Sequence, residues 1–495
     1  MSFIVNWLRS SRESSPTTSS LEDEDDCRGS DQQSNSISRS ESLRLDGSRS
    51  RSASISESSR RMQSQRERRE TARLRAEGHS RRRLRAIIGK PRCDLVALRK
   101  VCWNGVPEDL RFQVWPLLLG YAPRDKDRRE RGMQQRRSDY ALLVKRYWQS
   151  AVRDDANMAL TRTQRSCMRQ IDVDVPRTVP LYEGFRLRRL QEALRRVLFI
   201  YALRHPATSY VQGINDVATP LFVCFLRRFV RDPLDLSQVA RRFGDESEKD
   251  RYCTDLVDET AGDNVTGNDD QNVNSGNGKD DGTDVEQFSE KKHTDDSRSD
   301  QTRTESESNS ASQSVDSELD ADMALAVVEA DVFCCLGKLL DVIQDHYTHQ
   351  QPGIQRQIAR LGELLPRVDQ ALHEHLQESS VVLLQFAFRW MNCLLIRELP
   401  LPCMLRLWDA YFSLGADLGA AFREFHVFVC AALLVQFGEH LRTLPFQDII
   451  LFLQRMPPLL HWDTRQVEEL LSQAFLYQAL FGGAASSVPD SPTFR

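Results

Sequence analysis

The sequence predicts an all-α domain that follows a polar tail and is divided by a long acidic insertion. Apolar residues recur at three- and four-residue spacing along most of the chain, as on one face of a helix. No region shows several alternating strands bounded by hairpin turns. Two segments hold too few large apolar residues to build a core. With 495 residues, the chain can hold one large domain together with extended segments.

The N-terminal tail, residues 1–85, is predicted to be disordered and is rich in Ser and Arg. Residues 1–60 hold 20 serines and almost no apolar periodicity, so burial could not offset their chain entropy. From Arg60 to Lys100, 15 Lys and Arg stand against 4 Asp and Glu, a local net charge of +11. A solvated basic linker with some frayed helix fits this composition; contact with phosphate, acidic lipid or an acidic partner is the alternative.

Helical periodicity begins near Leu98, and the first well-marked helix lies in GVPEDLRFQVWPLLLG. Pro107 suits a first helical position, and the two acidic residues that follow it suit the first turn. The same spacing predicts further helices, of which one has Pro366 as a kink or break. In chain order they cover Leu187–Tyr201, Leu325–Tyr347, Ile354–Leu376, Val381–Leu399, Ala420–Gln436 and Val467–Leu480.

The segment Val381–Leu399 is the most apolar of these. With Gln385 and Arg389 near its middle, it is predicted to be a buried core helix and not a membrane span. No apolar stretch of roughly 18 residues without a charge occurs, so no transmembrane segment is expected.

The acidic insertion, residues 233–322, divides the helical domain into 97–232 and 323–480. From Phe243 to Asp322, 24 Asp and Glu stand against 7 Lys and Arg, a net charge of −17. The insertion is predicted to be disordered, because helical patterning resumes directly after it. It is read as a solvated spacer, with pairing to the basic linker as the alternative. Residues 481–495 are predicted to form a second disordered tail.

Charge and cysteine usage exclude several classes of protein. The 67 Lys and Arg nearly balance the 71 Asp and Glu, for a net charge of −4, so a general polyanion binder is not favoured and no nucleic acid is expected as a partner. The 11 cysteines include no CxxC pair, and no metal site is expected. No phosphate-binding, dinucleotide-binding or serine-hydrolase motif is present. These features indicate an intracellular protein.

Arg177 is the first candidate functional residue, in the segment IDVDVPRTVP. Pro176 and Pro180 disfavour helix at the residues before them, so an extended, exposed loop is predicted here. A guanidinium on such a loop could reach phosphate oxygens in a partner's active site. Asp174 could orient it; the alternative is that Asp174 and Arg177 only form a local ion pair.

Gln212 is the second candidate, in SYVQGIND. An amide can both donate and accept hydrogen bonds, as the positioning of an attacking water requires. The alternative is structural: Ser209 and Gln212 have the spacing of a capping box, and Gly213 could simply let another backbone approach. Arg111 and Trp115, four residues apart on the first helix, are predicted to form a structural contact in which the arginine packs against the indole.

Together these motifs resemble the TBC domain of Rab GTPase-activating proteins. The family's RxxxW, IxxDxxR and YxQ signatures occur in order as Arg111–Trp115, Ile171–Asp174–Arg177 and Tyr210–Gln212. Later segments that match are LLDVIQDHYTHQQPGIQ, LQFAFRWMNCLLIRELPL and RLWDAYFS. They are most similar to the TBC domain family member 22 subgroup, and the resemblance covers about residues 97–232 and 323–480.

The resemblance implies a V-shaped, all-α domain that accelerates GTP hydrolysis by a Rab-type small GTPase. Arg177 and Gln212 would enter the partner's site as catalytic fingers, with Asp174 holding the arginine. Tyr210 and Gly213 would shape the loop of Gln212, while Ile171, Arg111 and Trp115 would be structural. GTP and Mg²⁺ would belong to the partner, so this chain would need no cofactor of its own.

The resemblance leaves a non-catalytic scaffold that binds Rab or adaptor proteins as the alternative function. It also implies a role in vesicle trafficking, with a cytoplasmic protein that associates peripherally with endomembranes; the subgroup suggests the Golgi. In the tail, RSRSASIS at Arg49–Ser56 resembles kinase sites that recruit phosphoserine-binding adaptors, with unmodified filler as the alternative. Which Rab is the substrate, and the oligomeric state, stay open.

Overall fold

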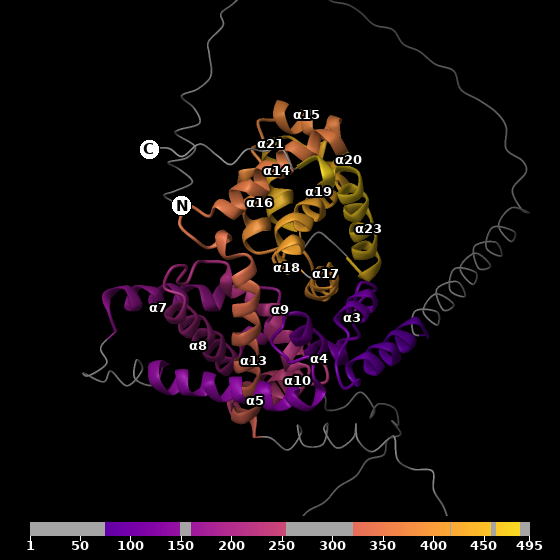
Figure 1. Ribbon diagram of the computed structural model, residues 1–495. Coiled ribbons are helices and arrows are strands. Elements are labelled where there is room, and N and C mark those ends of the chain that lie inside the picture. Colours follow the sequence, from indigo (N-terminus) through magenta and orange to yellow (C-terminus); the bar gives the residue numbers. More distant parts are fainter. Residues whose placement is uncertain (1–74, 149–159, 254–319, 416, 457–461, 486–495) are drawn as a thin grey trace, which may run out of the picture. The chain divides into compact units, whose positions relative to one another are not determined.

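The fold is helical throughout the part of the chain that the computed structural model describes (Figure 1). That part comprises residues 75–148, 160–253, 320–415, 417–456 and 462–485, all within one compact unit, Ala72–Arg495. Within these ranges the only β pairing is an isolated bridge between Arg92 and Asp125. The predicted all-α class is therefore confirmed.

Ahead of the insertion the chain forms a first set of helices. Residues 75–88 are helical. The elements that follow are α3 (Leu95–Cys102), α4 (Glu108–Leu118), α5 (Lys126–Leu143), the π-turn η1 (Val144–Trp148), α7 (Arg162–Asp174), the 3₁₀ turns η3 (Val175–Arg177) and η4 (Glu183–Arg186), α8 (Arg188–Arg204), α9 (Ile214–Leu226), α10 (Leu236–Phe243) and α11 (Glu246–Cys253).

A second set follows from residue 321. It comprises α13 (Ala321–Val342), η5 (Gln344–His346), α14 (Pro352–Val368), α15 (Gln370–Glu378), α16 (Leu384–Asn392), α17 (Leu401–Ser413), α18 (Leu418–Ala420), the π-turn η6 (Ala421–Phe425), α19 (His426–Gln436), α20 (Gly438–Leu441), α21 (Phe446–Gln454), α23 (Thr464–Phe481) and η7 (Gly482–Ala485).

The predicted helices after the insertion exist, but they do not end at the residues that the apolar spacing predicts. The run predicted at Ile354–Leu376 breaks at Asp369, whose carboxylate caps α15, while Pro366 lies inside α14. The run predicted at Val381–Leu399 is regular only in α16, because Leu394 and Leu395 adopt positive φ angles of 50° and 62°. Both leucines are fully buried, so packing compensates a backbone conformation that L-residues avoid.

The helix α13 joins the two sets, because it packs against α5, α8 and α9 from the first (Figure 1). Its buried Asp331 accepts hydrogen bonds from the Tyr121 hydroxyl at 2.6 Å and from Arg137 Nε at 2.8 Å. Two residues earlier, buried Glu329 pairs with Arg196 and accepts a hydrogen bond from the Tyr140 hydroxyl. Two acidic residues after the insertion thus neutralise arginines before it.

Asp409 on α17 makes a third connection of this kind. Its buried carboxylate accepts hydrogen bonds from Arg111 Nη2 at 3.0 Å, Trp115 Nε1 at 2.8 Å and the Val106 backbone N–H at 3.0 Å. Burial acts to lower the pKa of Arg111, but Asp409 raises it above its ordinary value. The RxxxW pair therefore does not meet by stacking; its members share one acceptor, for which their i, i+4 spacing suits them.

Two predicted boundaries are wrong within the described residues. The tail predicted at 1–85 is helical from residue 75, because Leu84 is buried and Arg81 and Arg85 bind Asp109 on α4. The predicted insertion begins too early, since α10 and α11 occupy its first part and α10 buries Phe243. Residues 1–74, with the predicted adaptor site, and residues 149–159, 254–319 and 486–495 lie outside the described ranges.

The core after the insertion centres on α19, which packs against α14 and α23. The run Leu418–Gln436 is long and apolar enough to cross a membrane. However, 72% of its most apolar 18-residue stretch is buried in the fold, as in the core helix of a globular domain. His426 starts α19 and is fully buried. Its Nε2 contacts the Trp390 carbonyl at 3.1 Å, so Nε2 carries the proton and Nδ1 accepts from the Tyr411 hydroxyl at 2.8 Å.

We expect Asp409→Ala to destabilise the protein by about 3–5 kcal/mol, because it leaves the Arg111 charge buried without a partner. Urea unfolding followed by circular dichroism measures the change. The control is Glu469→Ala, which removes an exposed pair with Arg465 at 2.9 Å and should cost no more than about 1 kcal/mol. Equal effects of the two substitutions would contradict the proposed importance of the buried pair.

We also expect stability to fall on acidification through His426. Burial lowers the pKa of His426 from its ordinary 6.5 to about 4, so the unfolded state binds the proton first as the pH falls. The stabilisation is complete above pH 6.5 and is lost toward pH 4. Between pH 7 and pH 5, wild type should lose roughly 2 kcal/mol more unfolding free energy than His426→Gln. Parallel losses would show that His426 is not the titrating group.

Candidate functional site

The Arg177 segment combines an exposed side chain with a fixed backbone. Arg177 is the last residue of the turn η3, which directly follows α7, so the extended loop predicted for IDVDVPRTVP is wrong up to Arg177. Val175 is helical in spite of the following proline, with φ −55° and ψ −48°, and its side chain is fully buried, so packing overrides the local preference. The Arg177 side chain is exposed and forms no hydrogen bond or ion pair with any described residue. Its carbonyl accepts a hydrogen bond from Arg397 Nη2 at 2.8 Å.

The Gln212 segment likewise combines an exposed side chain with a fixed backbone. The Gln212 side chain is exposed and makes no hydrogen bond to the rest of the described chain. Its carbonyl accepts a hydrogen bond from Asn392 Nδ2 at 2.9 Å. The capping box predicted for Ser209 and Gln212 is wrong: α9 starts at Ile214, with Gly213 as its N-cap and no side-chain cap. The amide of Gln212 is therefore not used for capping.

Asn215, on the first turn of α9, connects the two segments. Its Nδ2 donates to Thr178 Oγ1 at 2.9 Å, next to Arg177. Its Oδ1 accepts from the Gly213 backbone N–H at 3.0 Å, next to Gln212. One buried amide thus binds the neighbours of both exposed residues, which places the two segments side by side.

Tyr210 adds a second connection between the segments. Its hydroxyl lies 3.0 Å from Asp174 Oδ2 and 3.1 Å from Asn215 Oδ1. Burial and the Asp174 carboxylate raise the pKa of Tyr210 well above its ordinary value, so the phenol keeps its proton and can donate. Asp174 also accepts from Gln170 Nε2 at 2.9 Å, and it does not bind the Arg177 side chain. The expected Asp174–Arg177 pair is therefore wrong, because Asp174 is buried among other donors.

Asp216 supports the loop after Arg177 from within α9. Its Oδ1 accepts from the Val179 backbone N–H at 3.0 Å, and its Oδ2 accepts from Arg397 Nε at 2.8 Å. Burial acts to lower the pKa of Arg397, but Asp216 raises it. Val179 has a φ of 31°, a strained value for a β-branched residue. The hydrogen bond to Asp216 holds this strained backbone in place.

Gly213 is the position where the site most needs a glycine. Its φ is 108°, and a Cβ there would lie 2.3 Å from Asn392 Nδ2. The close approach lets Asn392 reach the Gln212 carbonyl. Asn392 is itself held by Tyr347, which directly follows η5, because the Asn392 carbonyl accepts a hydrogen bond from the Tyr347 hydroxyl at 2.8 Å.

The structure thus brings Arg177 and Gln212 together with Asp174, Tyr210 and Gly213. Arg111 and Trp115 lie in the separate buried cluster around Asp409, and Ile171 is a buried residue of α7. Sequence reasoning missed five supporting residues, which are Thr178, Asn215, Asp216, Asn392 and Arg397. The signal for Asn215 and Asp216 was present, since polar residues open an otherwise apolar helix. Asn392 and Arg397 had no such signal, because their partners are far away in the sequence.

Comparison with known families supports one helical domain that the acidic segment divides into two parts. The profile of the Rab-GTPase-TBC domain matches residues 108–230 and 321–442, on either side of the acidic segment. Among solved structures, the crystal structure of the Ypt/Rab-GAP domain of Gyp1p superposes with a TM-score of 0.58 at 30% sequence identity. This similarity covers 82% of this chain and 99% of that one.

Curated relatives align over most of the chain. The GTPase-activating protein gyp1 of Schizosaccharomyces pombe is 36% identical over 403 residues, which are 81% of this chain and 61% of the relative. Human TBC1 domain family member 22B is 35% identical over 403 residues, 81% of this chain and 62% of the relative. The chain therefore matches about three fifths of the length of these relatives.

We expect Gly213→Ala to destabilise the protein by about 2 kcal/mol or more, because alanine disfavours positive φ and its Cβ would displace Asn392. Thermal unfolding measures the effect. The matched control is Gly337→Ala within α13, where a Cβ meets nothing within 4 Å and the helix should gain about 0.5–1 kcal/mol. If Gly213→Ala were as stable as wild type, the close approach of Asn392 would not constrain this loop.

Proposed function

Since this chain belongs to the Rab-GTPase-TBC domain family, we propose that it is a GTPase-activating protein for a Rab-type small GTPase. The observation that carries the proposal is a pair of exposed side chains, Arg177 and Gln212, which have no partner among the described residues and lie on adjoining segments with fixed backbones. Its similarity to proteins named as GTPase-activating proteins supports the same activity.

Arg177 would supply positive charge to the partner's nucleotide. Hydrolysis of GTP spreads negative charge over the phosphate oxygens in the transition state, and a guanidinium binds such oxygens with forked hydrogen bonds. In comparable systems an arginine finger is worth on the order of 10³ to 10⁵ in rate. The carbonyl of Arg177 is bound to Arg397, so only the side chain has to be ordered when the partner arrives.

Gln212 would orient the attacking water. Its Oε1 can accept a hydrogen bond from the attacking water, and its Nε2 can donate one to a phosphate oxygen. The fixed Gln212 carbonyl and the glycine that follows it hold this amide at the surface without using it for folding. Because phosphoryl transfer depends mainly on positioning and charge, these two side chains suffice for activation.

The surface beside the two loops suits a protein partner. Val173 and Leu181 flank Arg177 in the sequence and are 47% and 58% exposed. Apolar side chains at such a place can be buried on association, while the polar fingers reach the nucleotide. The nucleotide and its Mg²⁺ would belong to the GTPase, and this chain would contribute no cofactor.

The test is a screen of GTP-loaded Rab-type GTPases for phosphate release stimulated by the full chain. With the responding GTPase, Arg177→Ala should lower the stimulated rate by about 10³ or more, and Gln212→Ala by about 10² or more. Both variants should keep the wild-type unfolding temperature, because neither side chain has a partner in the described fold.

Exposed residues of the same types serve as controls. Arg465→Ala and Gln447→Ala, on α23 and α21, should stimulate hydrolysis as wild type does. If wild type bound a GTP-loaded GTPase without stimulating any of those screened, the chain would act as a scaffold. Equal stimulation by wild type and both finger variants would refute the proposed mechanism.

A further inference from the structure

One edge of the first set of helices carries a large excess of positive charge. Residues 75–94 and 124–148 form this edge, and they hold 16 Lys and Arg against 6 Asp and Glu, a net charge of +10. The whole chain, in contrast, has a net charge of −4. In Figure 1 the helix of residues 75–88, in indigo beside α3, and the helix α5 follow this edge. We call the two stretches the basic edge.

Hydrogen bonds hold the two stretches of the basic edge against each other. The Cys93 backbone N–H donates to the Arg124 carbonyl at 2.9 Å. The Arg129 guanidinium donates to the Ile88 carbonyl through Nη1 at 3.2 Å. This junction gathers six exposed cations, which are Lys90, Arg92, Arg124, Lys126, Arg128 and Arg131.

The six exposed cations have no counter-charge within the fold, since none of them forms an ion pair with a described residue. Carboxylates from elsewhere neutralise only a small part of the basic edge. Asp109 pairs with Arg81 and Arg85, and Asp331 pairs with Arg137. Both contacts together still leave an excess of eight positive charges. Like charges so close together repel one another, and an anionic partner would relieve this repulsion.

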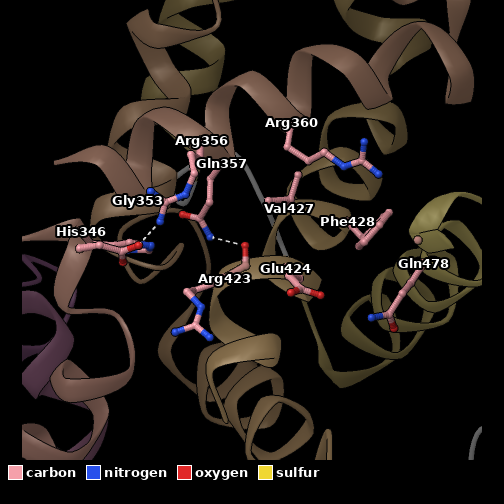
Figure 2. A pocket seen from close by; sticks show the side chains of 12 residues that line it. His346, Gly353, Arg356, Gln357, Arg360, Arg423, Glu424, Val427, Phe428 and Gln478 are labelled. Carbon is pink, nitrogen blue, oxygen red and sulfur yellow. Dashed lines mark hydrogen bonds and ion pairs between the residues drawn. The ribbon is translucent and has the colours of Figure 1, made fainter. Parts of the chain in front are cut away.

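An arginine-lined cavity in the second set of helices shows the opposite arrangement. It lies between η5, α14 and η6, and Figure 2 shows Arg356, Arg360 and Arg423 around it. Each of these arginines has an acidic partner, in the order Asp345, Glu363 and Asp417. The cations of the cavity are therefore neutralised by the fold itself, whereas those of the basic edge are left for another molecule.

The spread of the charges favours a membrane over a compact anion. Along α5 and η1 the exposed cations run from Lys126 to Arg146, a distance of about 30 Å at the rise of a helix. A single phosphate group could contact only a few of them. Anionic lipids move within a bilayer, so their head groups can match cations at any spacing.

Leu142 adds an apolar group to the basic edge. Its side chain is 64% exposed, and Lys145 and Arg146 follow it by one turn. The opposite face of α5 packs into the fold through Met133, Arg137 and Tyr140. An exposed leucine among cations can enter the boundary between lipid head groups and acyl chains. A nucleic acid would offer this leucine no comparable apolar environment.

We propose that the basic edge docks the protein on a membrane that contains anionic phospholipids, with the cations at the head groups and Leu142 at the boundary with the acyl chains. Arg177 and Gln212 lie on other segments of the chain, so docking does not use them. The inference therefore does not depend on the proposed GTPase activation.

Sedimentation of the full chain with lipid vesicles tests the proposal. Vesicles of phosphatidylcholine with phosphatidylserine should retain the wild type, and vesicles of phosphatidylcholine alone should not. Retention should fall as salt screens the charges. The triple variant Lys126→Gln, Arg128→Gln and Arg131→Gln should bind on the order of 10²-fold more weakly, at about fivefold for each charge removed.

The matched control is the triple variant Arg367→Gln, Arg455→Gln and Arg465→Gln. It removes the same charge from exposed positions in the second set of helices, and it should bind the vesicles as wild type does. Equal weakening in the two triple variants would mean that only the net charge of the chain matters, and it would overturn the proposal. Failure of the phosphatidylserine vesicles to retain the wild type would overturn it as well.

Leu142→Ser separates a membrane from other anionic partners. The substitution removes no charge, and it should weaken vesicle binding about fivefold or more because the apolar contact is lost. Its unfolding temperature should equal that of wild type, since the leucine is mostly exposed. Vesicle binding that Leu142→Ser leaves unchanged would overturn membrane docking and would indicate a surface for polyanions such as RNA.

Discussion

The account of this site depends on two hydrogen bonds that fix backbone and leave side chains free. Arg397 binds the carbonyl of Arg177, and Asn392 binds the carbonyl of Gln212, at 2.8 and 2.9 Å. Both donors come from the chain after the acidic segment, and both acceptors come from the chain before it. Because the constraint acts on carbonyls, the guanidinium and the amide stay available for another molecule. In a site of this kind the functional side chains can act on a partner molecule, because the fold of the chain itself does not depend on them.

Buried contacts between the helices before and after the acidic segment explain why the domain tolerates a long interruption of its chain. Asp331, Glu329 and Asp409 follow the interruption and bind arginines and tyrosines or tryptophan that precede it. A buried carboxylate without its partner would be costly, so these contacts make the second set of helices depend on the first. The two matched segments of the family profile are therefore one structural domain.

The sequence predicted the helical class and most of the helices, because apolar spacing reports burial on one face. It failed where tertiary packing overrides local preference: Val175 is helical before a proline, and Leu394 and Leu395 leave the helix although they are apolar. It also placed Arg177 and Gln212 as candidates, because motif spacing is local. The partners of their loops were not predictable, since Asn392 and Arg397 lie about 180 to 220 positions away from the carbonyls they bind. Asp174 shows the converse error, in which closeness in sequence suggested a contact that burial beside Tyr210 prevents.

The most direct test of the central claim is a crystal structure of this chain bound to a Rab-type GTPase that holds GDP, Mg²⁺ and aluminium fluoride. The account predicts that the Arg177 guanidinium and the Gln212 amide both lie within about 2.7–3.1 Å of the fluoride group or the in-line water, with the Arg397 and Asn392 hydrogen bonds intact. A complex in which either side chain points away from the nucleotide, or in which the partner docks on another face, would contradict it.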